Sequence, residues 1–389
     1  MNVLKLIYKN ALRHKLRSVL TALGIAVAVL AFGLLRTIID AWYAGAEASS
    51  SARLVTRNAV SLVFPLPLAY KDKIAKVAGV TGVSYGQWFG GRYKDPKNFF
   101  AQLAVEPESF LDLYPELLLS EEEKEDFLHE RIACIVGVKL ANKYGWKLGD
   151  TFRLTGTIFP GDWDFVIRGI YRGAEKSTDE ATMYFHWKYL DENLRETTRV
   201  PPGYVGIFWV RVASPDSVAQ VSEQIDALFE NSLAETKTET ERAFALSFVS
   251  MVGAVITALQ VISVVVIAII LLVLANTMAM TARERITEYA LMKTLGFRPK
   301  HILSLIFGES TLIALFGGLF GIFLTIPICD AFGQFISENL GSIFPVFGLK
   351  DSTIVLSVIA AISVGFAAAI FPTIRAIQMK IADGLRQIG

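Results

Sequence analysis

Long apolar runs alternate with polar stretches along the chain, and four of these runs have the length of a membrane span. They cover residues 18–35, 248–274, 302–328 and 354–374. A helix that crosses the hydrocarbon core needs roughly 20 predominantly apolar residues, so each run predicts a transmembrane helix. The first run is longer than the usual core of a secretory signal, and three later spans would hold the chain in the membrane in any case.

A segment of ordinary globular composition separates the first two runs and is long enough to bury a core of its own. Alternation of apolar and polar residues predicts strands at 99–105, 132–136, 151–154, 165–171, 181–185 and 205–212. Helical spacing predicts helices at 68–77, 107–113, 138–144 and 217–229, and the acidic stretch 121–126 is typical of a solvated helix face. We therefore expect an α+β domain.

The residues that flank this domain predict helical stalks. Residues 36–57 could continue the first span outward, and the helix-like stretches 214–233 and 236–248 could descend into the second span. Arg36 would then lie at the membrane boundary, with its charged end reaching toward water.

Basic residues in the short segments predict the orientation of the chain. Residues 1–17 carry five basic residues and no acid, and both the loop 281–301 and the tail from Arg375 onward are basic, whereas the loop after the third span is acidic. The basic segments fall on one side if both termini are cytoplasmic. The large domain is then extracytoplasmic, in the periplasm or outside the cell.

These patterns predict an α-helical membrane protein with four transmembrane helices plus an α+β extracytoplasmic domain on helical stalks. The expected order is a cytoplasmic amphipathic helix on the lipid surface (1–17), a first span (18–40), the α+β domain with its stalks (41–245), a second span (246–280), a cytoplasmic helical loop (281–301), a third span (302–328), a short outer loop (329–352), a fourth span (353–376) and a cytoplasmic tail (377–389).

Motifs of soluble enzyme chemistry do not occur in the sequence. It has no GxxxxGK[ST] phosphate loop, no HExxH, no GxSxG and no CxxC, and its four histidines are scattered. We therefore expect no catalytic, metal or cofactor site in these residues. The net charge of +1 disfavours nucleic acid as a partner. The two cysteines, Cys134 and Cys329, are typical of small buried apolar residues, and a disulfide between them stays open.

The stretch 276–296 begins as the tail of the second apolar run and becomes a charged amphipathic segment. Glu284 and Glu288 are one helical turn apart, Lys293 closes the last turn, Gly296 suits a left-handed cap, and Pro299 suits the first turn of the next helix. Such a helix can lie on lipid headgroups or sit in a groove of a partner protein.

Two polar residues interrupt the spans. Glu309 lies roughly 10 Å into the third span at about 1.5 Å per residue. An intramembrane acid costs on the order of 2.5–3.5 kcal/mol, so we expect Glu309 to face protein or water. Gln260 is expected to bond between helices. Small residues predict close helix packing at Gly317 and Gly321, at Gly365 in the fourth span, and at Ala22 and Ala26 in the first.

Several of these segments together resemble the FtsX/MacB-type family of ABC transporter permeases. The resemblance is carried by residues 10–25, by 276–296 with Arg283-Glu284-Arg285 and the run from Leu291 to Gly296, and by 371–376 and 381–386. Weaker similarities to the extracytoplasmic domain of MacB-like members occur at 105–110, 135–137 and 149–150. The similarity covers nearly the whole chain, in the same order.

The resemblance implies a permease subunit driven by a separate ATPase subunit, which would hold the ATP and Mg²⁺. The cytoplasmic loop would be its coupling helix, with contacts from Arg283, Glu284, Arg285, Glu288, Met292, Lys293, Leu295 and Gly296. It also implies a homodimer in the inner membrane that transmits ATP-driven motion to the outer domain.

The family offers more than one function. We expect efflux or export of a substrate or release of a lipoprotein, with a periplasmic adaptor as a further partner. The alternative is an FtsX-like regulator of cell-wall hydrolases. An ion-coupled carrier or intramembrane enzyme would need a polar constellation in the spans, where only Glu309 and Gln260 stand out.

Overall fold

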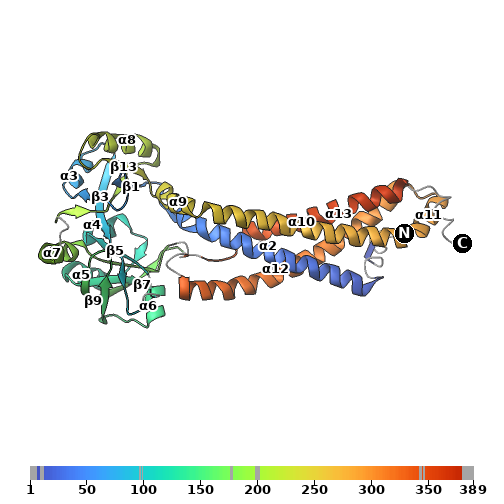
Figure 1. The fold of residues 1–389 in the computed structure, drawn as a ribbon, viewed down its shortest axis with the longest axis horizontal. Helices are drawn as coiled ribbons and strands as arrows, with labels where there is room; N and C mark the ends of the chain where they lie inside the picture. The colour runs from blue at the N-terminus through green and yellow to red at the C-terminus, as the bar shows by residue number, and fades with distance from the viewer. Residues whose placement is uncertain are drawn as a thin grey trace. The chain divides into compact units, whose positions relative to one another are not determined.

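The computed structural model describes residues 7–8, 13–95, 98, 100–175, 178–197, 202–340, 344 and 347–378. The chain divides into two compact units (Figure 1). The first, called the membrane unit, comprises Met1–Asp40, Gly253–Gly333 and Gly348–Gly389. The second, called the β-rich unit, comprises Ala41–Val252 and Gln334–Phe347. The expected amphipathic helix at 1–17 and the tail 377–389 lie mostly outside the described residues.

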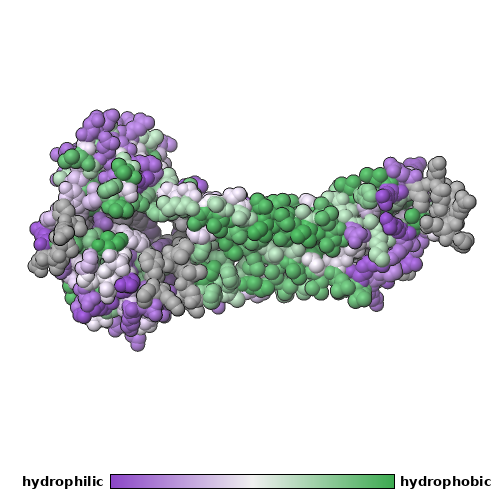
Figure 2. Space-filling view, in the orientation of Figure 1, coloured by the Kyte–Doolittle hydropathy of each residue, from purple (hydrophilic) through white to green (hydrophobic). Residues whose placement is uncertain are grey.

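Four long helices supply the candidate spans, as the apolar runs predict. They are α2 (Lys15–Ala48), α10 (Gly253–Glu284), α12 (Pro299–Leu340) and α13 (Asp351–Gln378). Each has the length and hydropathy to cross a membrane. The surface of these helices is predominantly hydrophobic (Figure 2), as expected for side chains that face lipid.

Small residues let these helices approach closely. A β-carbon at Gly317 would lie 2.6 Å from the backbone oxygen of Ala22, and one at Gly321 would lie 2.6 Å from that of Ala26. The two glycines of α12 therefore pack directly on the backbone of α2. Gly365 of α13 makes the same kind of contact with α12, where a β-carbon would lie 2.7 Å from that of Ala314. These contacts link three of the four spans.

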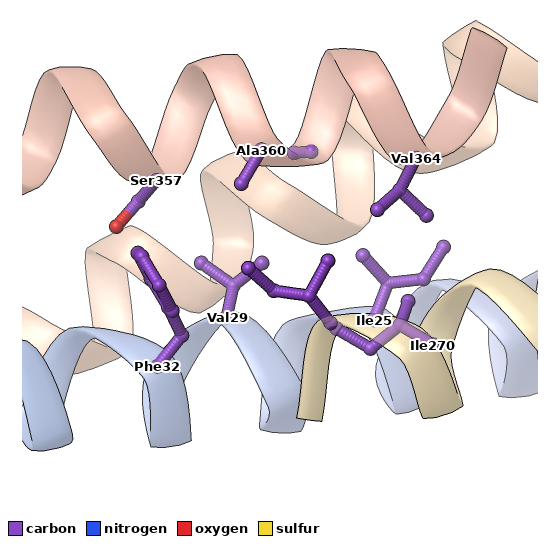
Figure 3. Close-up of a pocket in the computed structure, with 9 residues that line it drawn as sticks. Ile25, Val29, Phe32, Ile270, Ser357, Ala360 and Val364 are labelled. Atoms are coloured by element: carbon purple, nitrogen blue, oxygen red, sulfur yellow. The ribbon is translucent and has the colours of Figure 1, made fainter. Parts of the chain in front are cut away.

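The middle of the membrane unit is apolar and tightly filled. Figure 3 shows Ile25, Val29 and Phe32 of α2, Ile270 of α10 and Val364 of α13 around a small gap. Its volume is about 10 Å³, which holds at most one water molecule. The hydroxyl of Ser357, the polar side chain at this gap, donates to the carbonyl of Thr353. A gap of this size and polarity does not accommodate a substrate.

An 11-stranded sheet forms the centre of the β-rich unit among the described residues, in the order β13-β1-β12-β3-β5-β10-β7-β9-β8-β4, with β6 beside β9. The strands are β1 (Arg53–Asn58), β3 (Val80–Trp88), β4 (Gly91–Arg92), β5 (Ala101–Val105), β6 (Leu117–Leu118), β7 (Ala133–Gly137), β8 (Thr151–Gly156), β9 (Gly161–Gly173), β10 (Thr182–His186), β12 (Ile207–Val212) and β13 (Thr236–Thr240). Pairs β10–β5 and β7–β9 are parallel and the others antiparallel. A separate two-stranded sheet joins β2 (Leu66–Pro67) and β11 (Tyr204–Val205).

Helices cover both faces of the large sheet. One core contains side chains from α3 (Tyr70–Ile74), α6 (Val138–Tyr144), α7 (Trp187–Thr197) and α8 (Val218–Leu228), which follows the short 3₁₀ turn η1 (Pro215–Ser217). The other contains side chains from α4 (Pro107–Leu113), α5 (Glu121–His129) and α9 (Glu241–Met251). Strand β7 shows the alternation: Cys134 and Val136 enter the first core, Ala133 and Ile135 the second. The sheet is thus buried on both sides, and the α+β expectation is confirmed.

Two expectations about the stalks are wrong. Residues 236–240 form strand β13 rather than helix, and the helix starts at Glu241 with Thr240 as its cap. Residues 53–57 belong to β1, which pairs on both sides with β12 and β13. Threonine-rich 236–240 gains more from this pairing than from helix formation, because its branched side chains suit a sheet. The predicted second span is also interrupted at Val252, between α9 and α10.

Other boundaries differ from the expected ones. Strand β3 and helix α7 were not predicted, α10 continues through Glu284, and α12 continues to Leu340, beyond Pro327. Cys134 lies buried in β7 and Cys329 lies buried in α12, and both are free thiols. The disulfide left open by the sequence is therefore absent between these two described residues.

Candidate functional site

A short helix, α11 (Ile286–Thr294), connects two candidate spans at one end of the membrane unit. It begins because Arg285 leaves the helical conformation (φ −103°, ψ 14°). It ends in a Schellman cap: the N–H of Gly296 donates to Lys293 O and the N–H of Phe297 donates to Met292 O, with Gly296 at φ +85°. Pro299 then starts α12. The predicted roles of Gly296 and Pro299 in ending and starting helices are confirmed.

A buried ion pair joins the start of α11 to α12. Nη1 of Arg285 donates to Oε2 of Glu309 at 2.9 Å, and the side chains are only 4% and 7% exposed. The intramembrane acid thus faces protein, as expected, and its partner is a cation 24 residues earlier in the chain. Tyr289 packs beside this pair, and burial together with the charge of Glu309 raises the pKa of its hydroxyl to about 12.

Basic residues at the start of α2 and in the turn before it hold the two other acids of this segment. Arg17 binds Glu284 through two N–H···O contacts of 2.8 Å, and His14 lies 3.8 Å from the same carboxylate. Arg13 pairs with Glu288 on α11 itself. These contacts are partly solvent-exposed, so each one contributes little alone. Together they align α11 with the beginning of the first span.

The last turn of α11 is attached to the end of α13. Lys293 Nζ donates to the carbonyl of Ile377 at 2.8 Å. Beneath it, Tyr289 packs with Ile302 and Ile306 of α12 and with Ala369 and Ala376 of α13, and Met292 contacts this cluster. Helix α11 is therefore held by α12, by α13 and by the turn that leads into α2, and a force on it would reach all three.

The outward side of α11 remains uncovered among the described residues. Leu291 is 55% exposed and Leu295 is 69% exposed, and Thr294 lies exposed between them. Leucine side chains one turn apart on a helix form one apolar contact surface. Two exposed leucines on a short, firmly held helix make a small docking edge.

The eight residues predicted to couple this segment thus divide by position. Glu284, Arg285, Glu288, Met292 and Lys293 bond or pack within the chain, whereas Arg283, Leu295 and Gly296 are exposed. Leu291 was not singled out from the sequence. Its spacing of four from Leu295 was the available signal.

Gln260 does not make the expected contact between helices of this chain. It lies exposed on α10, the span with the smallest buried share. Among the described residues no group of three or more His, Cys, Asp or Glu side chains could hold a metal ion.

The fold and this site together define a polytopic membrane subunit with a short helix presented between its spans. Comparison with known proteins extends this conclusion. Residues 260–381 match the family model of the FtsX-like permease C-terminal region, and residues 18–228 match that of the MacB-like periplasmic core domain. The chain belongs to the FtsX/MacB-like family of ABC transporter permeases.

The chain is also similar to individual proteins of known sequence or structure. An uncharacterised ABC transporter permease of Methanocaldococcus jannaschii is 24% identical over 410 residues, covering 99% of this chain and 98% of the relative. Among solved structures, the extracellular domain of the noncanonic ABC-type transporter YknZ from Gram-positive bacteria has 14% sequence identity and a TM-score of 0.35, covering 48% of this chain and 100% of that domain.

Proposed function

We propose that this permease converts the cycle of a separate ATPase subunit, which binds ATP and Mg²⁺, into movement of its β-rich unit outside the cytoplasm. The movement serves export or efflux of a substrate or release of a lipoprotein, as in MacB-type members. Both termini and α11 are then cytoplasmic, in agreement with the basic residues of the short loops. A second copy of the chain completes the assembly.

The observation that carries this proposal is the geometry of α11. Leu291 and Leu295 face outward, while Arg285, Glu288 and Lys293 tie the same helix to α12, the turn that leads into α2 and the end of α13. A partner that grips the two leucines would move these elements together, because ion pairs and packing hold α11 to each of them. The narrow, apolar gap in the middle of the unit supports transmission of movement rather than a central path for substrate.

The β-rich unit offers a separate contact surface for a client or an adaptor. Val60, Val63 and Phe64 are exposed in the loop after β1, and Leu233 is exposed in the loop before β13. The two loops are neighbours, because Ala59 N–H donates to Glu235 O at 2.8 Å. Exposed apolar side chains that gather in this way are typical of interaction sites.

Co-purification of the ATPase tests the proposal. We expect Leu291→Ser with Leu295→Ser to lose the ATPase subunit that the unaltered permease retains. The matched control is Leu118→Ser with Leu148→Ser, which alters two leucines of similar exposure in the β-rich unit and should retain it. If the double variant of α11 still retains a fully coupled ATPase, α11 is not the docking helix.

Function in the cell separates transport from regulation. Accumulation of a substrate or an unreleased lipoprotein after deletion supports the MacB-type function. A defect in cell separation without accumulation would instead indicate an FtsX-like regulator of cell-wall hydrolases, with the same docking through α11.

A further inference from the structure

A groove with two arginines at its rim opens where α10 and α13 end. It is lined by Ala279, Ala282, Arg283, Ile286, Phe371, Pro372, Arg375 and Ala376. Six of these side chains are apolar and two are guanidinium groups, and no acidic residue lines it. Its volume is about 150 Å³.

The side chains of the two arginines have different surroundings. Arg283 occupies the last turn of α10 and is exposed, and it does not take part in the acid pairs that hold Glu284 and Glu288. The guanidinium of Arg375 lies over the ring of Phe371, with Cζ 4.4 Å from the ring centroid. Stacking on an aromatic ring orients the planar group and leaves its edge N–H donors available. The groove therefore presents fixed positive charge above an apolar floor.

Its position in the fold places this groove at a membrane surface. Helix α10 is a candidate span that ends at Glu284, and α13 is a candidate span that ends at Gln378. The groove is lined by residues within a few turns of both ends. Acyl chains and phosphate groups of lipids meet at this depth, and basic pockets between helices at this level bind anionic headgroups.

We propose that this groove binds an anionic phospholipid. Arg283 and Arg375 pair with its phosphate, while Phe371, Pro372 and Ile286 contact the glycerol and the first methylenes of an acyl chain. Charge complementarity favours this occupant, since two cations without an acid attract a phosphate. Ile286 is the first residue of α11, so a bound lipid also touches the helix between the spans.

This proposal goes beyond the proposed function, because it needs only that the chain lies in a membrane. It is tested on the full-length purified protein by native mass spectrometry after delipidation. We expect retention of phosphatidylglycerol but not of phosphatidylcholine with the same acyl chains. Arg283→Gln with Arg375→Gln should weaken phosphatidylglycerol binding at least about tenfold, because two charge-assisted contacts are lost.

A charge-matched control separates the groove from general attraction. Arg298→Gln with Lys300→Gln removes two exposed positive charges near the same loop but outside the groove, and should leave binding within about twofold of the original. Equal loss in both double variants would overturn the proposal, and so would equal binding of the two lipids. A thermal unfolding curve of each variant verifies that the membrane unit is intact.

Two further arms identify the occupant. Inorganic phosphate at millimolar concentration should not displace phosphatidylglycerol. If it does, the ligand of the groove is free phosphate and the lipid proposal fails. Deletion of residues 379–389 should leave lipid binding unchanged. If binding appears only after this deletion, the tail of the chain is the occupant and the lipid proposal fails.

Discussion

The guanidinium of Arg285 and the carboxylate of Glu309 lie 2.9 Å apart, and both side chains are almost completely buried. Removing two charges from water is costly, and the mutual attraction of the pair offsets much of that cost only while both partners are present. The intact pair therefore adds little to the net stability of the fold, whereas removal of only one partner would cost much more. It fixes the position of α11 relative to α12.

Breaking this pair on one side should destabilise the membrane unit strongly. We expect Glu309→Ala or Arg285→Ala to lower the free energy of unfolding by about 3–5 kcal/mol, because either change leaves a buried charge without a partner. The double variant Arg285→Met with Glu309→Leu should recover most of the loss. A double variant as unstable as the sum of both single variants would show that the two side chains act independently.

Cysteine reactivity provides the measurement. Cys329 lies buried in the membrane unit, and Cys134 lies buried in the β-rich unit. In a Cys134→Ala background, reaction with a thiol dye during heating reports unfolding of the membrane unit alone. All six tryptophans lie between Trp42 and Trp209, so tryptophan fluorescence reports the β-rich unit in the same sample.

Close packing of α12 on α2 leads to a second prediction. Gly317→Ala and Gly321→Ala each place a β-carbon 2.6 Å from a backbone oxygen of α2. We expect each change to cost about 1–3 kcal/mol through forced separation of the helices. The same Cys329 assay should record earlier unfolding.

Gly24 supplies the matched control for this packing. It lies in α2, where a β-carbon would meet no atom within 4 Å. Gly24→Ala should be neutral or stabilising, since alanine is the better helix former by about 1 kcal/mol. Equal destabilisation by all three changes would contradict the close contact.

A buried arginine network in the β-rich unit leads to a third prediction. Arg53 of β1 binds Glu241 at 3.0 Å, Glu116 at 2.5 Å and the carbonyl of Leu113 at 2.9 Å, and it lies over the ring of Tyr114. We expect Arg53→Gln to lower the free energy of unfolding of this unit by about 3–5 kcal/mol, because two carboxylates lose their cation. Arg53→Lys should rescue little, since an ammonium cannot serve three acceptors in one plane.

Arg153 is the control for this network. Its bonds to Asp164, at 2.7 and 2.8 Å, join two side chains that are each 59% exposed. Arg153→Gln should therefore leave the free energy of unfolding nearly unchanged. Tryptophan fluorescence during denaturation compares both variants, and a similar loss in each would show that burial does not matter here.

The sequence predicted the parts of this protein that depend on local patterns. Four apolar runs identified the spans, and the bounds of α4 and α6 were predicted correctly because each has an uninterrupted helical period and a clear start. Gly296 was predictable as a cap, since a residue at φ +85° is energetically favourable mainly for glycine.

Contacts between distant residues were not predictable in the same way. Arg17 meets Glu284 across 267 positions, and no local pattern pairs one basic residue with that acid rather than another. Strand β1 was missed because Arg53 and Arg57 look solvent-exposed, whereas burial with acidic partners makes them part of a sheet. The contact edge formed by Leu291 and Leu295 was likewise not predictable, because its evidence is the exposure of these two side chains in the folded chain.

His186 makes the stability of the β-rich unit depend on pH. It is buried at the end of β10, where its Nε2 contacts the carbonyl of Phe127. Burial lowers the pKa of the imidazole, and the charges of Arg131 and Lys188 lower it further, against the effect of the Phe127 carbonyl. The folded state therefore holds this histidine neutral more strongly than the unfolded chain does.

The direction of the effect follows from proton binding. Below about pH 6.5 the unfolded chain protonates its histidine while the folded state does not, so stability falls as pH decreases, by up to about 1.4 kcal/mol per pH unit. His186→Gln keeps an N–H donor for the Phe127 carbonyl but cannot titrate, so it should remove this slope between about pH 6.5 and 5.

His129→Gln is the control, because that ring is exposed. Burial raises the pKa of Asp179, whose opposite contribution is shared by all three proteins and cancels in their differences. Tryptophan fluorescence during denaturation at several pH values measures the slope, and an unchanged slope in His186→Gln would assign the acid sensitivity to carboxylates instead.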